Sequence, residues 1–131
     1  MIAAACRLLR FMAGKIMTIH SGCIFCQIGS GKLPAAMVYQ DDQCFAFDDV
    51  NPKAPVHVLV VPRRHIATLA DGGEDEKALL GHLLFIAARV AATKGIRSFR
   101  TVINTNAEAG QTIYHLHIHV LGGRLMRWPP G

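Results

Sequence analysis

Three histidines stand at every second position near the C-terminal end of the sequence, at His115, His117 and His119. Successive side chains of a β-strand point to opposite faces, so a strand over residues 115–121 would gather all three imidazoles on one face. Like charges held close together disfavour the protonated form, so at least one ring should be neutral near pH 7. A neutral imidazole is a nucleophile, and a neighbouring ring that carries a proton can protonate a leaving group.

The same spacing also suits a metal site, because imidazoles that face one another are common zinc ligands. Spacing alone therefore leaves covalent catalysis and metal binding open. The neighbouring residues favour phosphate chemistry, because the backbone N–H groups and hydroxyl of Gly110, Gln111 and Thr112 could cradle a phosphate beside the strand. His57 is either a buried core residue or a partner that orients the nucleophilic ring, and we favour the second.

The elements that must position these residues follow from apolar periodicity and turn signals. Residues 56–62 are rich in β-branched side chains and end at a proline, which is typical of a strand. Three acidic residues precede an apolar helical repeat that Gly95 follows. The predicted elements are a hairpin over 37–48, strands over 56–62, 99–104 and 115–121, a long helix over 74–94 and a short helix near Cys23. They indicate an α+β domain with an antiparallel sheet of about five strands.

Composition fits one domain of 131 residues, of which 51% are hydrophobic. The formal charge is +5, but Arg7, Arg10 and Lys15 lie in the first 16 residues, and without them the charge is +2. Charge therefore gives little reason to expect a nucleic-acid partner. No segment approaches the roughly 20 apolar residues of a membrane-spanning helix, so we expect no membrane partner.

Residues 1–16 form a basic leader without acids, a composition typical of an organelle-targeting segment. The alternative is a frayed tail, with Met17 as the true first residue. We accordingly divide the chain into a leader over 1–16 and a domain over 17–131, and leave a mitochondrial or cytoplasmic location open. Four cysteines are too few for a disulfide scaffold, so a reducing compartment is the simpler assumption.

The run HLHIHVL matches the signature of the histidine triad (HIT) superfamily, in which histidines and apolar residues alternate. Three longer stretches resemble its histidine triad nucleotide-binding branch, the adenosine phosphoramidases. They are CIFCQIGSGKLPAAMVYQDD, CFAFDDVNPKAPVHVLVVPRRH and VINTNAEAGQTIYHLHIHVLGGRLMRWPPG. The resemblance extends over residues 23–131 almost without interruption.

The resemblance implies a HIT-like fold and a homodimer in which the two sheets join, each protomer with a pocket for a purine nucleotide such as AMP. It implies that His117 attacks the α-phosphate and forms a nucleotidyl-histidine that water then cleaves. His119 would contact the phosphate or the leaving group, and His57 would orient the nucleophile. The main chain of His115 would hold the tautomer of His117.

The same resemblance implies the nucleotide-binding residues. Asp49 would bind the ribose hydroxyls, and Phe47 and Val50 would form part of the base pocket. The phosphate-side residues would be Asn104, Gly110, Gln111, Thr112, His117 and His119. The loop differs from the branch in carrying Thr112 where serine is frequent and Ala109 where glycine is frequent.

Cys23 and Cys26 form a CxxC pair, which is common in zinc sites and in redox motifs. Some relatives complete such a pair with residues equivalent to His65 and His115, which implies a closed, structural zinc site here. The alternative is that the cysteines pack as small apolar residues and bind no metal. Catalysis itself would need no cofactor.

We therefore expect a hydrolase that cleaves purine nucleoside 5'-phosphoramidates, and also aminoacyl adenylates, with release of AMP. Two alternatives remain. One is a nucleotide-binding or zinc-binding interaction protein with incidental turnover, and the other is a diadenosine polyphosphate hydrolase. An intact third histidine favours hydrolysis over transfer to a sugar phosphate, because the transferase relatives carry glutamine there.

Overall fold

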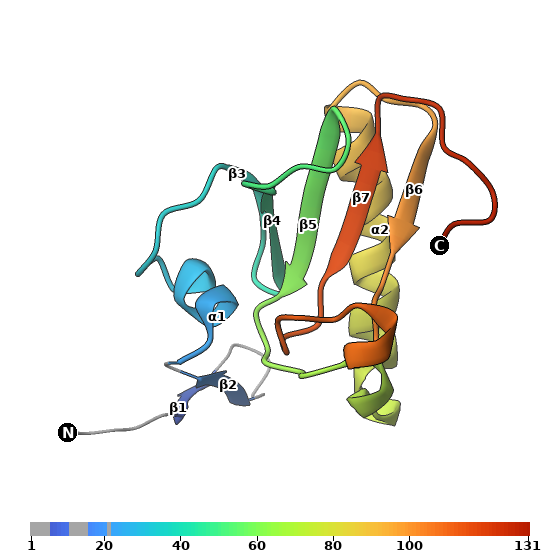
Figure 1. Ribbon diagram of the computed structural model, residues 1–131. Helices are drawn as coiled ribbons and strands as arrows, with labels where there is room; N and C mark the ends of the chain where they lie inside the picture. The colour runs from blue at the N-terminus through green and yellow to red at the C-terminus, as the bar shows by residue number, and fades with distance from the viewer. Residues whose placement is uncertain (1–5, 11–15, 21) are drawn as a thin grey trace.

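Five antiparallel strands form the main sheet of the computed structural model, which describes residues 6–10, 16–20 and 22–131 (Figure 1). Their order is β3-β4-β5-β7-β6. The strands are β3 (Met37–Gln40), β4 (Cys44–Asp48), β5 (Val56–Pro62), β6 (Phe99–Val102) and β7 (Ile118–Gly122). The helices are α1 (Ile24–Gly29) and α2 (Lys77–Thr93), with short 3-10 turns at Leu69–Asp71, Glu74–Glu76 and Ala107–Ala109. The predicted α+β fold with a five-stranded antiparallel sheet and one long and one short helix is confirmed.

A separate hairpin precedes α1 and pairs β1 (Cys6–Arg10) with β2 (Ile16–His20). The predicted division between residues 16 and 17 falls inside β2, and much of the predicted leader, residues 1–5 and 11–15, lies outside the described residues. The leader and the cellular location stay predictions. Within the part of the chain that is described, neither helix is long and apolar enough to cross a membrane.

Alternation along the central strands divides the core into two layers. Val58 and Val60 of β5 face α2, and their neighbours Leu59 and Val61 face α1. The α2 layer also buries Leu83, Ile86, Ala87, Val90, Ala91, Leu116, Ile118 and Val120. The α1 layer is smaller and consists of Phe25, Ile28, Phe45, Phe47, Leu59 and Val61. The sheet therefore presents a fully covered face to α2 and a partly open face toward α1 (Figure 1).

The long helix begins three residues later than predicted, because residues 74–76 form a 3-10 turn before α2. The Glu76 carboxylate accepts a hydrogen bond from the Gly73 amide at 2.6 Å and lies 3.0 Å from the Arg64 guanidinium. At the other end, Gly95 follows the helix with φ of +79°, a conformation that favours glycine. Lys94 contacts Asp48 at 2.8 Å and joins this end of the helix to β4.

The prediction of a strand over residues 115–121 is wrong at its start, because β7 begins at Ile118. Val60 pairs with Ile118, so the same register would place Leu116 opposite Pro62, which has no N–H to donate. The Leu116 amide instead donates to the Ile66 carbonyl at 2.7 Å. The strand predicted over 99–104 likewise ends early, at Val102.

Candidate active site

A cleft of about 770 Å³ lies between α1 and the open face of the sheet. Apolar side chains of α1 form one wall, and the loops that precede β5 and β7 supply polar groups at its mouth. His57, His117 and His119 all line this cleft. Although β7 starts late, Leu116 is buried against α2 while His117 and His119 face the opposite way, as predicted. The prediction that all three imidazoles gather at one site is wrong for His115, whose ring is fully buried and does not line the cleft.

His117 carries its proton on Nδ1. This atom lies 2.7 Å from the main-chain oxygen of His115, and a carbonyl oxygen can only accept a hydrogen bond. The contact predicted between the His115 main chain and the His117 ring is therefore present, and its role in catalysis stays a prediction. Burial lowers the pKa of His117 below its ordinary value, so the ring is neutral near pH 7. The Nε2 atom of His117 consequently carries a free lone pair.

His119 has the opposite tautomer. The Lys53 main-chain N–H donates to Nδ1 of His57 at 2.9 Å, so the neutral His57 ring carries its proton on Nε2. That proton is donated to Nδ1 of His119, also at 2.9 Å, and the proton of His119 is therefore on Nε2. Burial, with the neighbouring rings of His117 and His57, lowers the pKa of His119 to about 4.

The partner of His57 differs from the one we predicted. We expected His57 to orient His117, but its ring is hydrogen-bonded to His119 instead. The reason is register, because His57 pairs with Leu121 and so lies diagonal to His119 on the same face. Burial also lowers the pKa of His57, although the Asp49 carboxylate lies 3.4 Å from its Nε2.

Most of the predicted nucleotide-binding residues meet at the cleft. Those that line it are Phe47, Asp49, Val50, Asn104, Gly110, Thr112, His117 and His119. Asp49 accepts a hydrogen bond from the Asn51 amide at 2.9 Å, which fixes one of its oxygens and leaves the other near His57. Val50 is 96% exposed and therefore forms the rim rather than the floor.

Gln111 is the exception, because its side chain points into the protein and is only 4% exposed. Its Nε2 donates to the carbonyls of Ala67 at 2.8 Å and Ile113 at 3.1 Å, and its Oε1 accepts from the Asn106 amide at 2.8 Å. Gln111 thus braces the loop that carries Gly110 and Thr112. The prediction for Gln111 concerned its backbone N–H as a phosphate donor, and it stays a prediction; the side chain supports the loop.

The apolar wall of the cleft was not predicted. Ile24, Phe25 and Ile28 of α1 line it, and the Phe25 ring meets the His117 ring edge to face at 5.1 Å between centroids. The spacing of these three residues is that of one helix face, a signal that the short helix predicted near Cys23 already contained. Leu33, Leu59 and Ile113 complete the apolar lining.

A second cluster brings together the four predicted metal ligands, Cys23, Cys26, His65 and His115, with all four ligand atoms within 4.8 Å of one another. The fully buried His115 ring donates from Nε2 to the Pro62 carbonyl at 2.8 Å, so its Nδ1 faces the thiols. That Nδ1 lies 3.3 Å from the Cys23 sulfur and 3.6 Å from the Cys26 sulfur, and His65 Nδ1 lies 3.4 Å from Cys26.

These separations fit a tetrahedral zinc ion, whose ordinary bond lengths place sulfur and nitrogen ligands about 3.5 Å apart. Hydrogen bonding with Cys26 and His115 lowers the pKa of Cys23 to about 3, which favours the thiolate that a metal requires. The donation from His115 to Pro62 is the kind of outer hydrogen bond that orients a metal-binding imidazole. The donor set therefore fits a structural zinc site.

Comparison with known proteins identifies similar chains of known family. The model of the HIT domain family matches residues 30–126. An uncharacterized HIT-like protein of Synechocystis is 55% identical over 109 residues, which cover 82% of this chain and 96% of that protein. The crystal structure of a HIT family hydrolase from Legionella pneumophila is 44% identical, with a TM-score of 0.82 over 84% of this chain and 100% of that one.

Two further solved structures are less similar, and the names of the proteins state what they bind. A zinc-bound histidine triad family protein from Mycobacterium smegmatis is 31% identical, with a TM-score of 0.69 over 79% of this chain and 76% of that one. A histidine triad nucleotide-binding protein from Candida albicans is 25% identical, with a TM-score of 0.64 over 76% of this chain and 73% of that one.

Proposed function

The chain belongs to the HIT domain family, and from that premise we propose that it hydrolyses purine nucleoside 5'-phosphoramidates through a covalent nucleotidyl intermediate on His117, releasing AMP. Its fold and its relatives are those of a HIT family hydrolase. The observation that carries the proposal is the tautomer of His117. A buried, neutral imidazole whose Nδ1–H donates to the His115 carbonyl directs a free lone pair on Nε2 into a cleft of nucleotide size.

In the first step, the Nε2 lone pair of His117 forms a bond to the α-phosphorus while the bond from phosphorus to the leaving nitrogen breaks. The electron pair of that bond stays on the nitrogen, which takes the proton of His119 Nε2 and leaves as an amine. The His117 ring becomes positively charged, and its Nδ1–H continues to donate a hydrogen bond to the His115 carbonyl. Loss of the Nε2 proton leaves the His119 ring as an imidazolate with one negative charge. The ring centroids of His117 and His119 are 5.0 Å apart, so the positively charged His117 ring stabilises this anion until water returns the proton in the second step.

In the second step, water attacks the phosphorus and the bond to His117 breaks, so AMP is released. The electron pair of that bond returns to His117 Nε2, and one proton of the water restores His119. Division of one displacement into two easier ones is the benefit of the covalent intermediate. Apart from this water molecule, both proposed steps use only groups of this chain, so we propose a reaction without a catalytic cofactor.

Recognition of the nucleotide is proposed from the chemistry of the cleft. The carboxylate of Asp49 is placed to accept hydrogen bonds from ribose hydroxyls, and the wall of Phe25, Ile28 and Phe47 suits a flat purine. The hydroxyl of Thr112 and the backbone beside Gly110 suit the phosphate. The nucleotide-binding relative from Candida albicans supports this assignment. Aminoacyl adenylates share the same AMP portion and are proposed as further substrates.

A structural zinc ion is proposed at Cys23, Cys26, His65 and His115, because the donor atoms already lie at the separations such an ion requires. The zinc-bound relative from Mycobacterium smegmatis supports it. The ion would join the start of α1 to the segment that follows β5 and to the segment that precedes β7. Its chemistry would be that of a closed cross-link, and no catalytic step passes through it.

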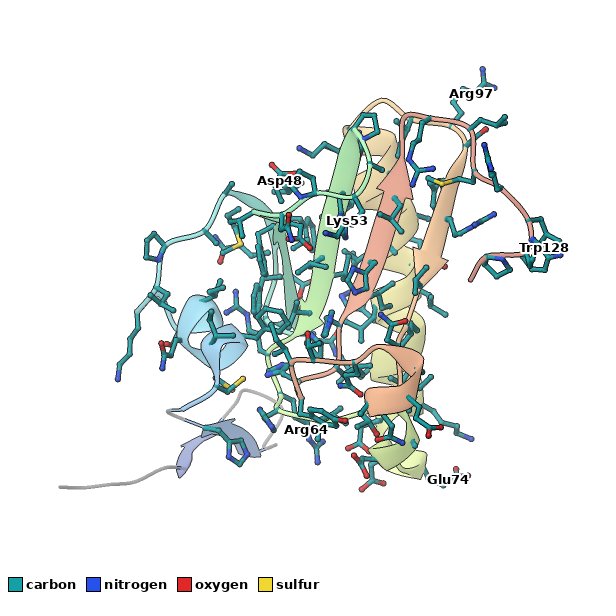
Figure 2. All side chains as sticks on the ribbon, in the orientation of Figure 1. Asp48, Lys53, Arg64, Glu74, Arg97 and Trp128 are labelled. Atoms are coloured by element: carbon teal, nitrogen blue, oxygen red, sulfur yellow. The ribbon has the colours of Figure 1, made fainter. Side chains whose placement is uncertain are left out.

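A homodimer is also proposed. The C-terminal segment exposes large apolar side chains, with Leu125 90% and Trp128 79% accessible. Figure 2 shows Trp128 on the outer side of β6, and the Arg100 guanidinium lies 5.8 Å from the centre of its ring. Exposed apolar groups of this size favour a partner surface. A second copy of the chain would cover them and bring Trp128 toward the neighbouring cleft. Light scattering that gives the mass of a monomer at micromolar concentration would contradict this proposal.

The decisive experiment is rapid quenching of the protein with adenosine 5'-phosphoramidate, followed by intact mass and peptide mapping. We expect a mass increase of one adenylyl group on the peptide that contains His117. His82→Gln is the matched control, because His82 is an imidazole outside the cleft that is bonded to Asp41. An adduct on any other residue, or full turnover in His117→Ala, would overturn the mechanism.

A further inference from the structure

A continuous chain of hydrogen bonds runs from the main chain of Lys53 through His57 to His119. We infer that the Lys53 main-chain N–H is a positioning group for the reaction, because it sets the tautomer of His57 and, through it, the N–H that His119 presents to the leaving atom. This inference rests on the proposed function and names the group that fixes its proton donor. The Lys53 side chain makes no hydrogen bond in this chain of contacts; burial is the main cause of the lowered pKa of His57, and the Lys53 charge adds to it.

The first link is unambiguous because a main-chain amide can only donate a hydrogen bond. Nδ1 of His57 lies 2.9 Å from the Lys53 nitrogen and must present a lone pair to it. The His57 ring is buried, so losing this bond would leave a polar group without its partner. The neutral His57 ring therefore holds its one proton on Nε2.

The second hydrogen bond, from His57 to His119, makes the tautomer of His119 depend on that of His57. The Nε2 proton of His57 has an acceptor 2.9 Å away in His119 Nδ1, while the Asp49 carboxylate oxygen is more distant at 3.4 Å. Acceptance through Nδ1 leaves His119 with its proton on Nε2, the nitrogen on the far side of the ring. His119 thus lines the cleft as a donor rather than as a second nucleophile.

Two main-chain groups therefore give opposite tautomers to two histidines that are two residues apart. The His115 carbonyl accepts from His117 and leaves a lone pair on its Nε2, whereas the Lys53 amide acts through His57 and leaves a proton on Nε2 of His119. The consequence for substrates is a leaving atom that has a lone pair to accept this proton. Nitrogen in a phosphoramidate and oxygen in an adenylate both meet that requirement.

The loop that carries the amide is held at several points. The Asp49 amide donates to the His57 carbonyl at 2.9 Å, and the Asn51 amide donates to the Asp49 carboxylate at 2.9 Å. After β7, the Arg124 guanidinium donates to the Lys53 carbonyl at 3.2 Å. Figure 2 shows Lys53 in front of the sheet at β5. These contacts keep the N–H directed at His57.

The test compares Lys53→Pro, which removes the amide hydrogen, with Lys53→Ala, which keeps it. The probe is protein labelled with ¹⁵N-histidine, because ¹⁵N chemical shifts report which ring nitrogen is protonated. In the parent protein and in Lys53→Ala we expect the proton on Nε2 of His57 and His119 and on Nδ1 of His117. In Lys53→Pro we expect His57 and His119 to become mixtures of tautomers while His117 is unchanged.

The kinetic readout is the dependence of kcat on the basicity of the leaving amine. Loss of a positioned proton donor should lower kcat by about 10-fold to 100-fold for a basic alkylamine and by much less for a weakly basic arylamine. Lys53→Ala should keep the leaving-group dependence of the parent. An equal loss for both amines in Lys53→Pro, or the same leaving-group change in Lys53→Ala, would overturn the inference.

The labelled parent protein is an independent test if Lys53→Pro does not fold. A proton on Nδ1 of His57 in the parent would overturn the inference without any variant. This measurement needs no turnover, so it separates the two proposals. The expected tautomers in a protein that does not cleave phosphoramidates would contradict the proposed function and support the positioning role of Lys53.

Discussion

The ring of Phe25 lies edge to face against the ring of His117, with 5.1 Å between centroids, and also contacts His115 at 5.9 Å. Phe25 stands between Cys23 and Cys26, so the residue that touches the proposed nucleophile is held between two proposed metal ligands. The wall of the cleft and the cysteine cluster are therefore mechanically connected. Any change that displaces the start of α1 should therefore also displace the Phe25 ring that packs against His117.

Metal removal should weaken substrate binding more than chemistry. A strong chelator, or the double variant Cys23→Ala/Cys26→Ala, should lower the melting temperature and raise KM several-fold, because α1 supplies an apolar wall of the cleft. Metal analysis and thermal melting with and without chelator provide the measurement. Cys44→Ala is the control, since Cys44 is buried outside this cluster and its loss should leave the zinc content unchanged. Equal zinc content in the double variant and the parent would refute the assignment.

Replacement of the nucleophile should remove turnover and leave the fold intact. His117→Ala should reduce kcat at least about 1,000-fold, because no other lone pair is presented to the phosphorus by a neutral, buried ring. The variant should retain its circular dichroism spectrum and bind AMP. Retention of more than a tenth of the parent kcat would count against His117 as the nucleophile.

Gln111→Ala and Thr112→Ala should separate loop support from phosphate contact. Gln111→Ala leaves the carbonyls of Ala67 and Ile113 and the amide of Asn106 without their partner, at a cost of about 1–3 kcal/mol of unfolding free energy. Thr112 is exposed, so Thr112→Ala should change stability little and weaken AMP binding. Urea unfolding and AMP titration of both variants make the comparison. Equal stability losses would contradict it.

Stability should fall as the pH drops from about 6.5 toward 4. The pKa of His119 is about 4 in the folded state and 6.5 in the unfolded chain, so the unfolded chain binds more protons in this range. The free energy of unfolding is therefore highest above pH 6.5 and decreases as the pH falls from 6.5 to about 4. Cys23, with its pKa lowered to about 3, adds a slope of the same sign.

The measurement that isolates His119 is urea unfolding of the parent and His119→Gln at several pH values between 4 and 7. The variant should have a smaller slope, because glutamine does not titrate. Asp41, whose pKa is about 2, titrates below this window and does not confuse the comparison. Identical slopes in the two proteins would show that the His119 pKa is not displaced on folding.

Local pattern was sufficient to predict the strands of the main sheet and the two helices, but it missed the β1–β2 hairpin, most of which lies in the segment that we interpreted as a leader. The hairpin over 37–48 is encoded by its turn, where the Asp41 carboxylate accepts hydrogen bonds from the amides of Gln43 and Cys44, both at 2.7 Å. The alternation of Leu116, Ile118 and Val120 with the histidines placed the two sets on opposite faces even where the backbone is not a regular strand. The CxxC spacing indicated Cys23 and Cys26, and resemblance supplied His65 and His115 as the other two residues of the cluster.

Contacts between strands could not be predicted from local pattern, because they depend on register. The residues around Ile118 do not indicate that Pro62 would lie opposite Leu116, beyond the end of the pairing between β5 and β7. The partner of His57 also depends on how β5 aligns with β7, which places His119 and not His117 beside it. The direction of the Gln111 side chain depends on Ala67, 44 residues earlier in the chain.

His115 divides its two contributions between different atoms. Its ring belongs to the cysteine cluster, while its carbonyl oxygen accepts the hydrogen bond from His117 Nδ1. Every amino acid has such a carbonyl oxygen. A relative without the proposed zinc ion could therefore carry another buried residue in place of the first histidine of the motif. Its main-chain carbonyl would still fix the tautomer of the nucleophilic histidine. The ring and the carbonyl oxygen of residue 115 can therefore be selected separately, although one residue supplies both.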